Sequence, residues 1–262
     1  MRGFPMTITH TIKKRYEKRL ESKPSRIKEF EKLVIEQNRK NIISTSGQSV
    51  AIRPFIGNIC GNSTNFKIFN RQTKSIGGKI WLLVDCSGSI RGHDGELNSF
   101  CHDIMAAMEK SNTAQIEIVA FSCHPKKPIS VLDYISTKED CARIHHDETD
   151  YHDNLGQVLE IIKPKLTSTE HKQAVFIISD GYPECEDGKG RKIPQSDLIK
   201  NLKRQVVQLE NQKVKFFAIM LNRYSPQEVQ NIFRKNSYTT TDLNEGTNKL
   251  VIRINDFLKS LK

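Results

Sequence analysis

The sequence predicts an α/β protein with a doubly wound, mostly parallel central sheet and helices on both faces. Short apolar runs that end in polar loops alternate with segments whose apolar residues recur at helical spacing. The run at residues 80–84 has no polar alternation, which is typical of a strand covered on both faces in a parallel sheet. Right-handed crossovers would then bring the loops that follow the parallel strands to one edge of the sheet.

Strands are expected where short runs of apolar and β-branched residues occur after residue 76. These runs lie at residues 80–84, 116–121, 174–179, 214–221 and 238–243, the last of them at the edge of the sheet. Residues 124–136 contain two prolines and are expected to form a connection. A short helix is expected at residues 137–144, with Thr137 at its N-cap.

Helices are expected where apolar residues recur at three- and four-residue spacing. The stripes are Leu97, Phe100, Cys101, Ile104, Met105 and Met108; Leu155, Val158, Leu159 and Ile162; Leu198, Ile199, Leu202, Val206 and Leu209; and Leu250, Ile254, Phe257 and Leu261. A shorter helix is expected from Pro226 to residue 233. Asp153 lies directly ahead of the second stripe and is a candidate N-cap for that helix.

The excess positive charge is confined to the first part of the chain. Residues 1–76 contain 16 Lys and Arg, 5 Glu and no Asp, a balance of +11 that equals the net charge of the whole chain. We therefore divide the chain into a basic N-terminal extension at 1–76 and a neutral α/β domain at 77–262. The extension is expected to hold two helices between residues 11 and 40, divided at Pro24, and short strands at 49–56 and 65–70.

Composition excludes several classes of protein. The apolar fraction of 37% and the charged fraction of 27% are ordinary for a globular protein. No apolar run is long enough to span a membrane, and the first ten residues lack the apolar core of a signal peptide, so a cytoplasmic protein is expected. The six cysteines include no Cys-x-x-Cys pair, which favours reduced thiols over a zinc site or a disulfide framework.

A cluster of oxygen ligands follows the first strand of the domain. Asp85, Ser87 and Ser89 alternate with other residues, so a tight loop can direct all three side chains toward one point, and Gly88 tolerates unusual backbone angles there. Ligands of open α/β sheets bind just beyond such strand ends. Hard oxygen ligands with few carboxylates suit Mg²⁺ or Mn²⁺.

Two further elements downstream complete a known pattern. Thr149 lies in a polar loop, and Asp180 and Gly181 follow the apolar run at residues 174–179. With Asp-x-Ser-x-Ser, these resemble the von Willebrand factor A (VWA) domain with a metal-ion-dependent adhesion site. The resemblance implies a Rossmann-like VWA fold and a divalent cation held by Asp85, Ser87, Ser89, Thr149 and Asp180, with Gly88, Asp150 and Gly181 in supporting positions. The family places glycines before the threonine, whereas this chain has Asp147 and Glu148.

Three histidines close to Thr149 offer an alternative interpretation. His145, His146 and His152 could supply ligands or a general base to a metallohydrolase. The spacing lacks the His-Glu-x-x-His pattern of zinc proteases, and the cluster occupies the place of the expected threonine loop.

The segment ahead of the first domain strand indicates a subtype. Ser-Gly, then Phe-Lys-x-Phe, then Ser-Gly-Ser-Ile-Arg-Gly is similar to the lead-in of the cobaltochelatase T-subunit type (CobT), which some bacteriophages also encode. This resemblance implies a non-enzymatic, metal-dependent interaction module that serves a ring-forming AAA+ ATPase of the MoxR or cobaltochelatase S-subunit class, with a partner carboxylate on the metal. The chain has no phosphate-binding Gly-x-x-x-x-Gly-Lys-Ser/Thr loop of its own. The alternative is a nucleic-acid-associated protein that binds through its basic N-terminal segment.

Overall fold

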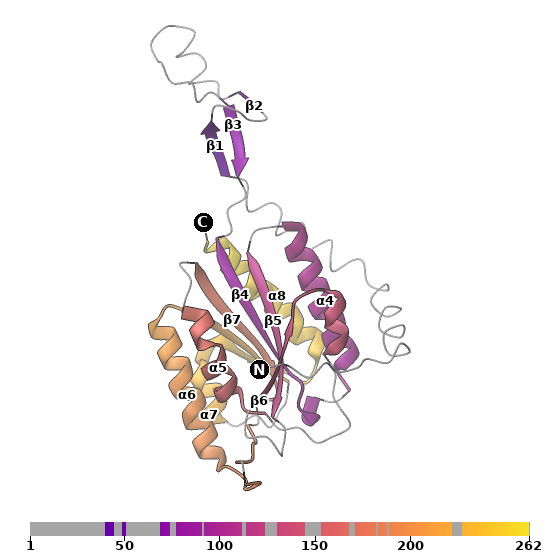
Figure 1. Cartoon of the computed structure of the whole chain (residues 1–262), viewed down its shortest axis with the longest axis vertical. Helices are drawn as coiled ribbons and strands as arrows, with labels where there is room; N and C mark the ends of the chain where they lie inside the picture. The colour runs from indigo at the N-terminus through magenta and orange to yellow at the C-terminus, as the bar shows by residue number, and fades with distance from the viewer. Residues whose placement is uncertain are drawn as a thin grey trace.

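The central element of the computed structural model is a six-stranded, mostly parallel sheet (Figure 1), as the sequence predicts. The strand order is β6-β5-β4-β7-β8-β9, and only the β5–β6 pair is antiparallel. The strands are β4 (Gly78–Asp85), β5 (Gln115–Cys123), β6 (Ser130–Ile135), β7 (Lys172–Ser179), β8 (Lys215–Met220) and β9 (Ser237–Thr239). The structure describes residues 40–44, 49–50, 69–73, 77–90, 92–111, 114–123, 130–144, 153–167, 171–181, 183–187, 189–221 and 227–261.

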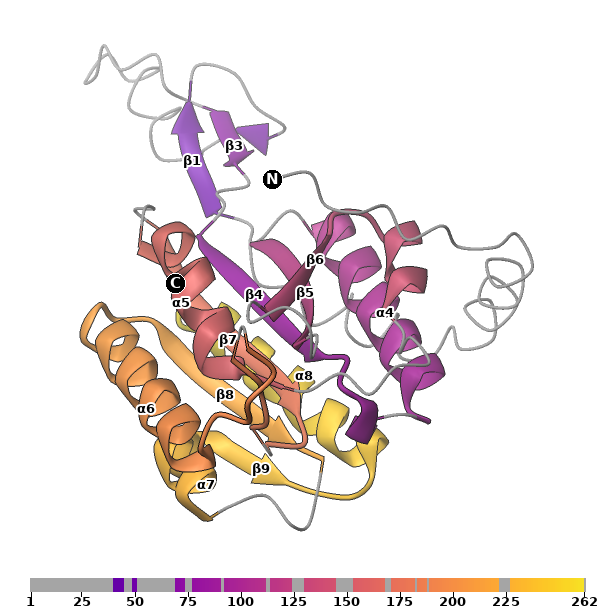
Figure 2. The same ribbon diagram turned by 60° about the horizontal axis from the view of Figure 1, so that its bottom comes forward.

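Helices cover both faces of this sheet (Figures 1 and 2), which confirms the doubly wound architecture. One face carries α4 (Asp94–Ser111) and α8 (Leu243–Lys259). The other carries α5 (Leu155–Thr167), α6 (Gln195–Asn211) and α7 (Gln227–Phe233). Short 3-10 turns lie at η1 (Gly88–Ile90), η2 (Glu139–Arg143) and η3 (Arg234–Asn236).

The strand β4 lies in the middle of the core, and its side chains alternate between the two helical layers. Ile80 and Leu82 pack with α4 and α8, whereas Trp81 and Leu83 pack with α5 and α6. All four side chains are fully buried, and the Trp81 indole donates a hydrogen bond to Gln173 Oε1 on β7 at 2.8 Å. Burial on both faces is the reason the run lacks polar alternation. The strand therefore delivers its last residue, Asp85, from a rigid support.

Two sequence expectations for the sheet edges are wrong in detail. Residues 130–135, expected within a connection, form the antiparallel edge strand β6, in which Leu132 faces Phe121 of β5. The run includes Asp133 and follows two prolines, so it lacks a continuous apolar signal. At the opposite edge, β9 ends at Thr239 rather than at residue 243. It ends early because Asp242 caps α8, accepting hydrogen bonds from the backbone N–H groups of Asn244 and Glu245.

A small antiparallel sheet precedes the domain, with strand order β1-β3-β2. Its strands are β1 (Lys40–Ser44), β2 (Ser49–Val50) and β3 (Phe69–Thr73). The strand expected at residues 49–56 begins as predicted at β2, and that expected at 65–70 overlaps β3. The rest of both, and the helices expected between residues 11 and 40, lie outside the described residues except for Lys40.

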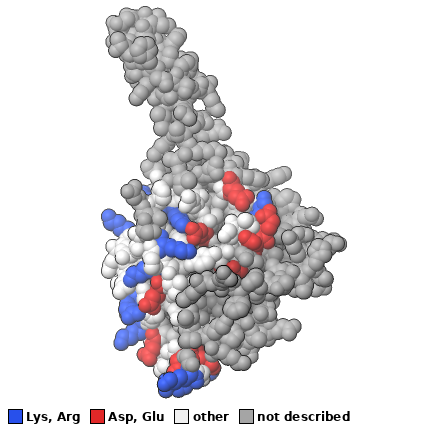
Figure 3. All heavy atoms as spheres, in the orientation of Figure 1, with Lys and Arg blue, Asp and Glu red and all other residues white. Residues whose placement is uncertain are grey.

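The described surface of the domain carries both signs of charge. In Figure 3, Lys and Arg side chains lie among Asp and Glu side chains over the described part of the visible face. This mixture agrees with the balance of 25 bases and 25 acids in residues 77–262. Among the described residues, no helix combines the length and apolar character needed to cross a membrane.

The close approach of α5 to α6 depends on Gly156. A Cβ atom at this position would lie 2.9 Å from the backbone N and 3.1 Å from the Cα of Leu202. We therefore expect Gly156→Ala to push the helices apart and lower the free energy of unfolding by about 1–3 kcal/mol. Chemical denaturation measures the loss, and Glu160→Ala, at an exposed position of the same helix, is the matched control. Equal stabilities of the two variants would contradict this packing.

Candidate metal centre

The candidate site lies where the winding of the sheet reverses. The chain passes from β4 to β5 on one side of β4, and later places β7 on its other side. Asp85 is the last residue of β4 and Asp180 follows β7 directly. Because these two central strands run parallel and side by side, both acids emerge at the same edge of the sheet. In open α/β sheets, this switch point is where ligands bind.

Three buried carboxylates meet at this point. Asp85, Asp153 and Asp180 each offer one oxygen atom, and these atoms all lie within 4.8 Å of one another. The three side chains are 0%, 3% and 3% exposed. Within the part of the chain that the structure describes, this is the group of acidic, histidine or cysteine side chains with the spacing to hold a metal ion. None of the described histidines belongs to it.

Serine hydroxyls surround the carboxylates. The Ser179 hydroxyl lies 2.9 Å from Asp85 Oδ2 and 3.0 Å from Asp153 Oδ2, and its single proton can serve only one of them at a time. The backbone N–H of Ser87 donates to Asp85 Oδ1 at 2.7 Å. The hydroxyls of Ser87 and Ser89 lie 2.9 Å apart. The predicted loop-one ligands Ser87 and Ser89 are therefore adjacent to each other and to Asp85.

The backbone around the site shows different roles for the two predicted glycines. Gly181 has a φ of 72°, in the left-handed region that favours glycine, and its N–H donates to the Ser179 hydroxyl at 3.0 Å. Gly88 lies in the 3-10 turn η1 and is not among the residues of positive φ. The expectation of unusual backbone angles at Gly88 is therefore wrong, because this residue has the ordinary angles of a 3-10 turn.

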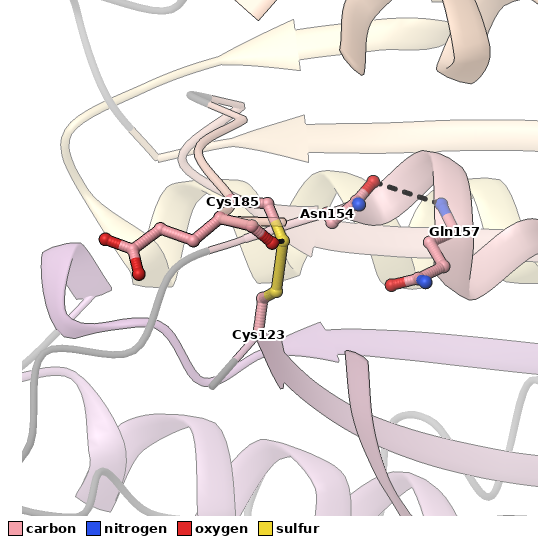
Figure 4. The surroundings of a disulfide bond; sticks show 5 residues. Cys123, Asn154, Gln157 and Cys185 are labelled. Carbon is pink, nitrogen blue, oxygen red and sulfur yellow. Dashed lines mark hydrogen bonds between the residues drawn. A yellow bond between two sulfur atoms is a disulfide. The ribbon is translucent and has the colours of Figure 1, made fainter. Parts of the chain in front are cut away.

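The position of Asp153 is a finding that the sequence reading missed. We expected it to cap the helix α5, but Asn154 does so: its side-chain oxygen accepts a hydrogen bond from the Gln157 N–H at 3.2 Å (Figure 4). Asp153 instead directs its side chain into the acidic cluster, and its Oδ1 atom is buried without a hydrogen-bond partner. The signal in the sequence was the pair of adjacent capping-type residues, of which only one is needed for the helix.

Several predicted residues lie outside the described part of the chain. These are Thr149 and Asp150 of the second loop and the three histidines His145, His146 and His152. Their proposed roles stay predictions. The structure brings together Asp85, Ser87, Ser89 and Asp180 from the predicted set and adds Asp153 and Ser179.

Burial and the repulsion between neighbouring carboxylates raise the pKa values of two acids in the cluster. Desolvation, followed by the charge of Asp180, raises the pKa of Asp85 from 3.8 to about 6. Burial, followed by the charges of Asp85 and Asp180, raises the pKa of Asp153 well above its usual value. A divalent cation would compensate these charges, and the Asp153 Oδ1 atom could then act as one of its ligands. The donor set, oxygen atoms of carboxylates and hydroxyls, fits Mg²⁺ or Mn²⁺.

A disulfide lies beside the site and corrects the expectation of reduced thiols throughout. Cys123 at the end of β5 is bonded to Cys185 in the loop between β7 and α6 (Figure 4). In the same loop, the Glu184 N–H donates to the backbone oxygen of Asp153 at 2.9 Å. The sequence concealed this pair because its members are 62 residues apart and become neighbours only through the sheet. Cys86, Cys101 and Cys141 are buried and form no disulfide among the described residues.

Together, the fold and the cluster define an α/β domain that collects acidic and hydroxyl side chains at the switch point of its sheet. The sequence model of the von Willebrand factor type A domain matches residues 79–253, and the chain belongs to this family. Among the curated proteins, none matches this chain.

Solved structures with the same fold include bacterial pilus proteins. The pilus adhesin SpaC from Lactobacillus rhamnosus GG, in its open conformation, is similar over 72% of this chain, with a TM-score of 0.53 and 11% identity. This chain spans 30% of the adhesin's length. The vWF domain of the type V pili tip protein Mfa5 from Porphyromonas gingivalis is similar over 71% of this chain and 97% of its own, with a TM-score of 0.51 and 7% identity. At these identities the likeness concerns the fold.

Metal binding should depend on pH through Asp85. Its folded pKa of about 6 exceeds its unfolded value of 3.8, so the stability that its proton contributes is complete below about pH 4 and is lost as the pH rises through 6. This loss is on the order of 2–3 kcal/mol in the metal-free protein. Because Mn²⁺ competes with protons, we expect the Mn²⁺-induced rise in Tm to grow between about pH 5 and about pH 7.5. Thermal melting at several pH values measures it, and a constant shift would contradict the raised pKa.

The disulfide predicts the number of reactive thiols. Without reductant, four of the six cysteines should react with a thiol reagent in denaturant, and all six after reduction. Because the bond closes a long loop, its reduction should lower the free energy of unfolding by about 2–4 kcal/mol. The double variant Cys123→Ser/Cys185→Ser is the control, since its stability should not respond to reductant. Six reactive thiols before reduction would restore the reduced state expected from the sequence.

Proposed function

We propose that this chain is a non-enzymatic protein-interaction module whose binding face is built on a divalent cation, Mg²⁺ or Mn²⁺. The observation that carries the proposal is the buried triad of Asp85, Asp153 and Asp180 at the switch point of the sheet, with one carboxylate oxygen that has no hydrogen-bond donor. Asp85 and Asp180, with the hydroxyls of Ser87 and Ser89, would hold the cation. The cation supplies an electrophilic point at which an oxygen atom of another protein can bind.

The surroundings of the cluster favour binding over catalysis. A hydrolase needs a positioned general base beside the metal-bound water. The hydrogen bonds described for Asp85 and Asp153 come from the Ser179 hydroxyl and the Ser87 backbone N–H. A serine hydroxyl can donate or accept a hydrogen bond but is a weak base near neutral pH. The two structurally similar pilus proteins also support an interaction role for a domain of this fold.

The proposed partner is a ring-forming AAA+ ATPase of the MoxR or cobaltochelatase S-subunit class. This rests on the similarity of the segment before and through β4 to the cobaltochelatase T-subunit type, and on the missing phosphate-binding loop in this chain. The basic segment at residues 1–76 would add an electrostatic contact to an acidic surface, either on this partner or on a nucleic acid.

An ATP-dependent partner implies a cytoplasmic location. The disulfide between Cys123 and Cys185 points the other way, because oxidising compartments favour such bonds. The count of reactive thiols in protein isolated without reductant therefore also tests the location.

Removal of Asp85 should abolish the metal response. In wild-type protein, Mn²⁺ or Mg²⁺ at about one hundred times its dissociation constant should stabilise the fold by about 2.7 kcal/mol, because it binds the folded state alone. We expect no such stabilisation in Asp85→Ala. The matched control Glu160→Ala removes an exposed acid of α5 and should respond as the wild type does.

Thermal melting with and without the metal measures the response. An unchanged metal-induced rise in Tm in Asp85→Ala would contradict the proposed centre. So would the absence of a rise in the wild type at every metal concentration tested.

A further inference from the structure

The acidic cluster contains one carboxylate more than the resemblance to the adhesion-site family implies. That resemblance provides two acids, Asp85 and Asp180, and leaves an open metal position for a partner's carboxylate. The structure places Asp153 beside both of them. Resting on the proposed function, we propose that Asp153 is an internal carboxylate ligand of the cation, so that the partner contributes a neutral oxygen donor, such as a backbone carbonyl, an amide or a hydroxyl, instead of a carboxylate.

The hydrogen bonding of Asp153 is that of a side chain prepared for a cation. Its Oδ2 shares the single Ser179 proton with Asp85, and its Oδ1 has no hydrogen-bond partner among the residues that the structure describes. A buried carboxylate oxygen without a donor is costly unless a cation or proton satisfies it. The side chain is only 3% exposed, so bulk water has little access to it.

The backbone fixes Asp153 in this position. Its carbonyl oxygen accepts the Glu184 N–H, which ties it to the loop after β7. The next residue, Asn154, caps α5 and fixes the direction in which the chain enters the helix. Asp153 is therefore held between two ordered elements that also frame Asp180. The backbone therefore fixes where the buried Asp153 side chain enters the cluster.

The charge of the cluster determines what kind of partner group can follow. Three ionised carboxylates around a divalent cation leave a net charge of −1 on the described ligands. A fourth carboxylate from a partner would raise this to −2 inside a buried site, where like charges repel strongly. A neutral oxygen completes the coordination without adding charge. The negative charge of Asp153 thus makes the cation favour a neutral partner group over an acidic one.

The experiment compares wild-type protein with Asp153→Asn, which keeps the shape of the side chain and removes its charge. Mn²⁺ affinity is measured by electron paramagnetic resonance of the free ion. We expect Asp153→Asn to bind Mn²⁺ at least about tenfold more weakly, since loss of even an outer partner of a metal ligand costs that much. Glu160→Gln, a charge-neutralising change at an exposed position of α5, should bind as the wild type does.

Partner selection is probed with acetate, which stands for a partner carboxylate. Water-proton relaxation reports displacement of the water bound to protein-held Mn²⁺. Acetate should leave the relaxation of the wild-type complex unchanged and should displace water from the Asp153→Asn complex. Thermal melting verifies that the variant is folded. The acetate measurement on wild-type protein tests the inference by itself, because it requires no variant.

The outcomes separate this inference from the proposed function. Equal Mn²⁺ affinity in wild type and Asp153→Asn, or displacement of water by acetate in the wild type, would overturn the role of Asp153 and leave the metal-dependent module standing. Failure of wild-type protein to bind Mn²⁺ would overturn both. Weaker binding by the variant, with acetate sensitivity confined to it, supports the inference.

Discussion

The crowding of three buried carboxylates at one edge of the sheet is the constraint on which the proposed function of this protein depends. Burial raises the pKa values of Asp85 and Asp153, and the charges of the neighbouring carboxylates raise them further. Two of these acids lie at the ends of neighbouring buried strands: Asp85 ends β4, and Asp180 follows β7. The serines that flank the acids offer too few protons to satisfy every oxygen. A cation resolves the repulsion and the missing hydrogen bond together.

The rest of the domain explains how the three acids are brought together and held in place. The apolar side chains of β4 pack into both helical layers, so the position of Asp85 is determined by a core that extends through the whole sheet. Asp153 is held by the helix cap at Asn154 and by the loop that carries Cys185. Each acid thus comes from a different, independently supported element. Such preorganisation lowers the cost of ordering ligands when the cation binds.

Much of the fold was predictable because its signals are local. The apolar runs of β4 and β7 and the stripes of α4, α6 and α8 each reflect burial that the residues themselves display. Asp85 and Asp180 were predictable as site residues because strand ends of a parallel sheet meet at one edge. The edge strand β6 was missed because it carries a polar residue and little continuous apolar character.

The misassigned residues near the site share a different cause. Asp153 and Asn154 are chemically alike as helix caps, and only the path of the chain decides which of them turns inward. The pairing of Cys123 with Cys185 likewise depends on two loops that approach each other through the sheet. Contacts of this kind arise from topology, and neither spacing nor composition reveals them. In the sequence, the third carboxylate, on which the proposed partner selection depends, is therefore visible only as one of two adjacent capping-type residues.

The most direct test of the metal centre is a crystal structure of the protein grown with Mn²⁺ and measured at a wavelength where manganese scatters anomalously. We expect one strong anomalous peak at coordination distance from carboxylate oxygens of Asp85, Asp153 and Asp180. The same map would reveal whether Thr149 also reaches the ion. A peak elsewhere, or no peak at this edge of the sheet with the three carboxylates unchanged, would contradict the claim that the cluster is a metal centre.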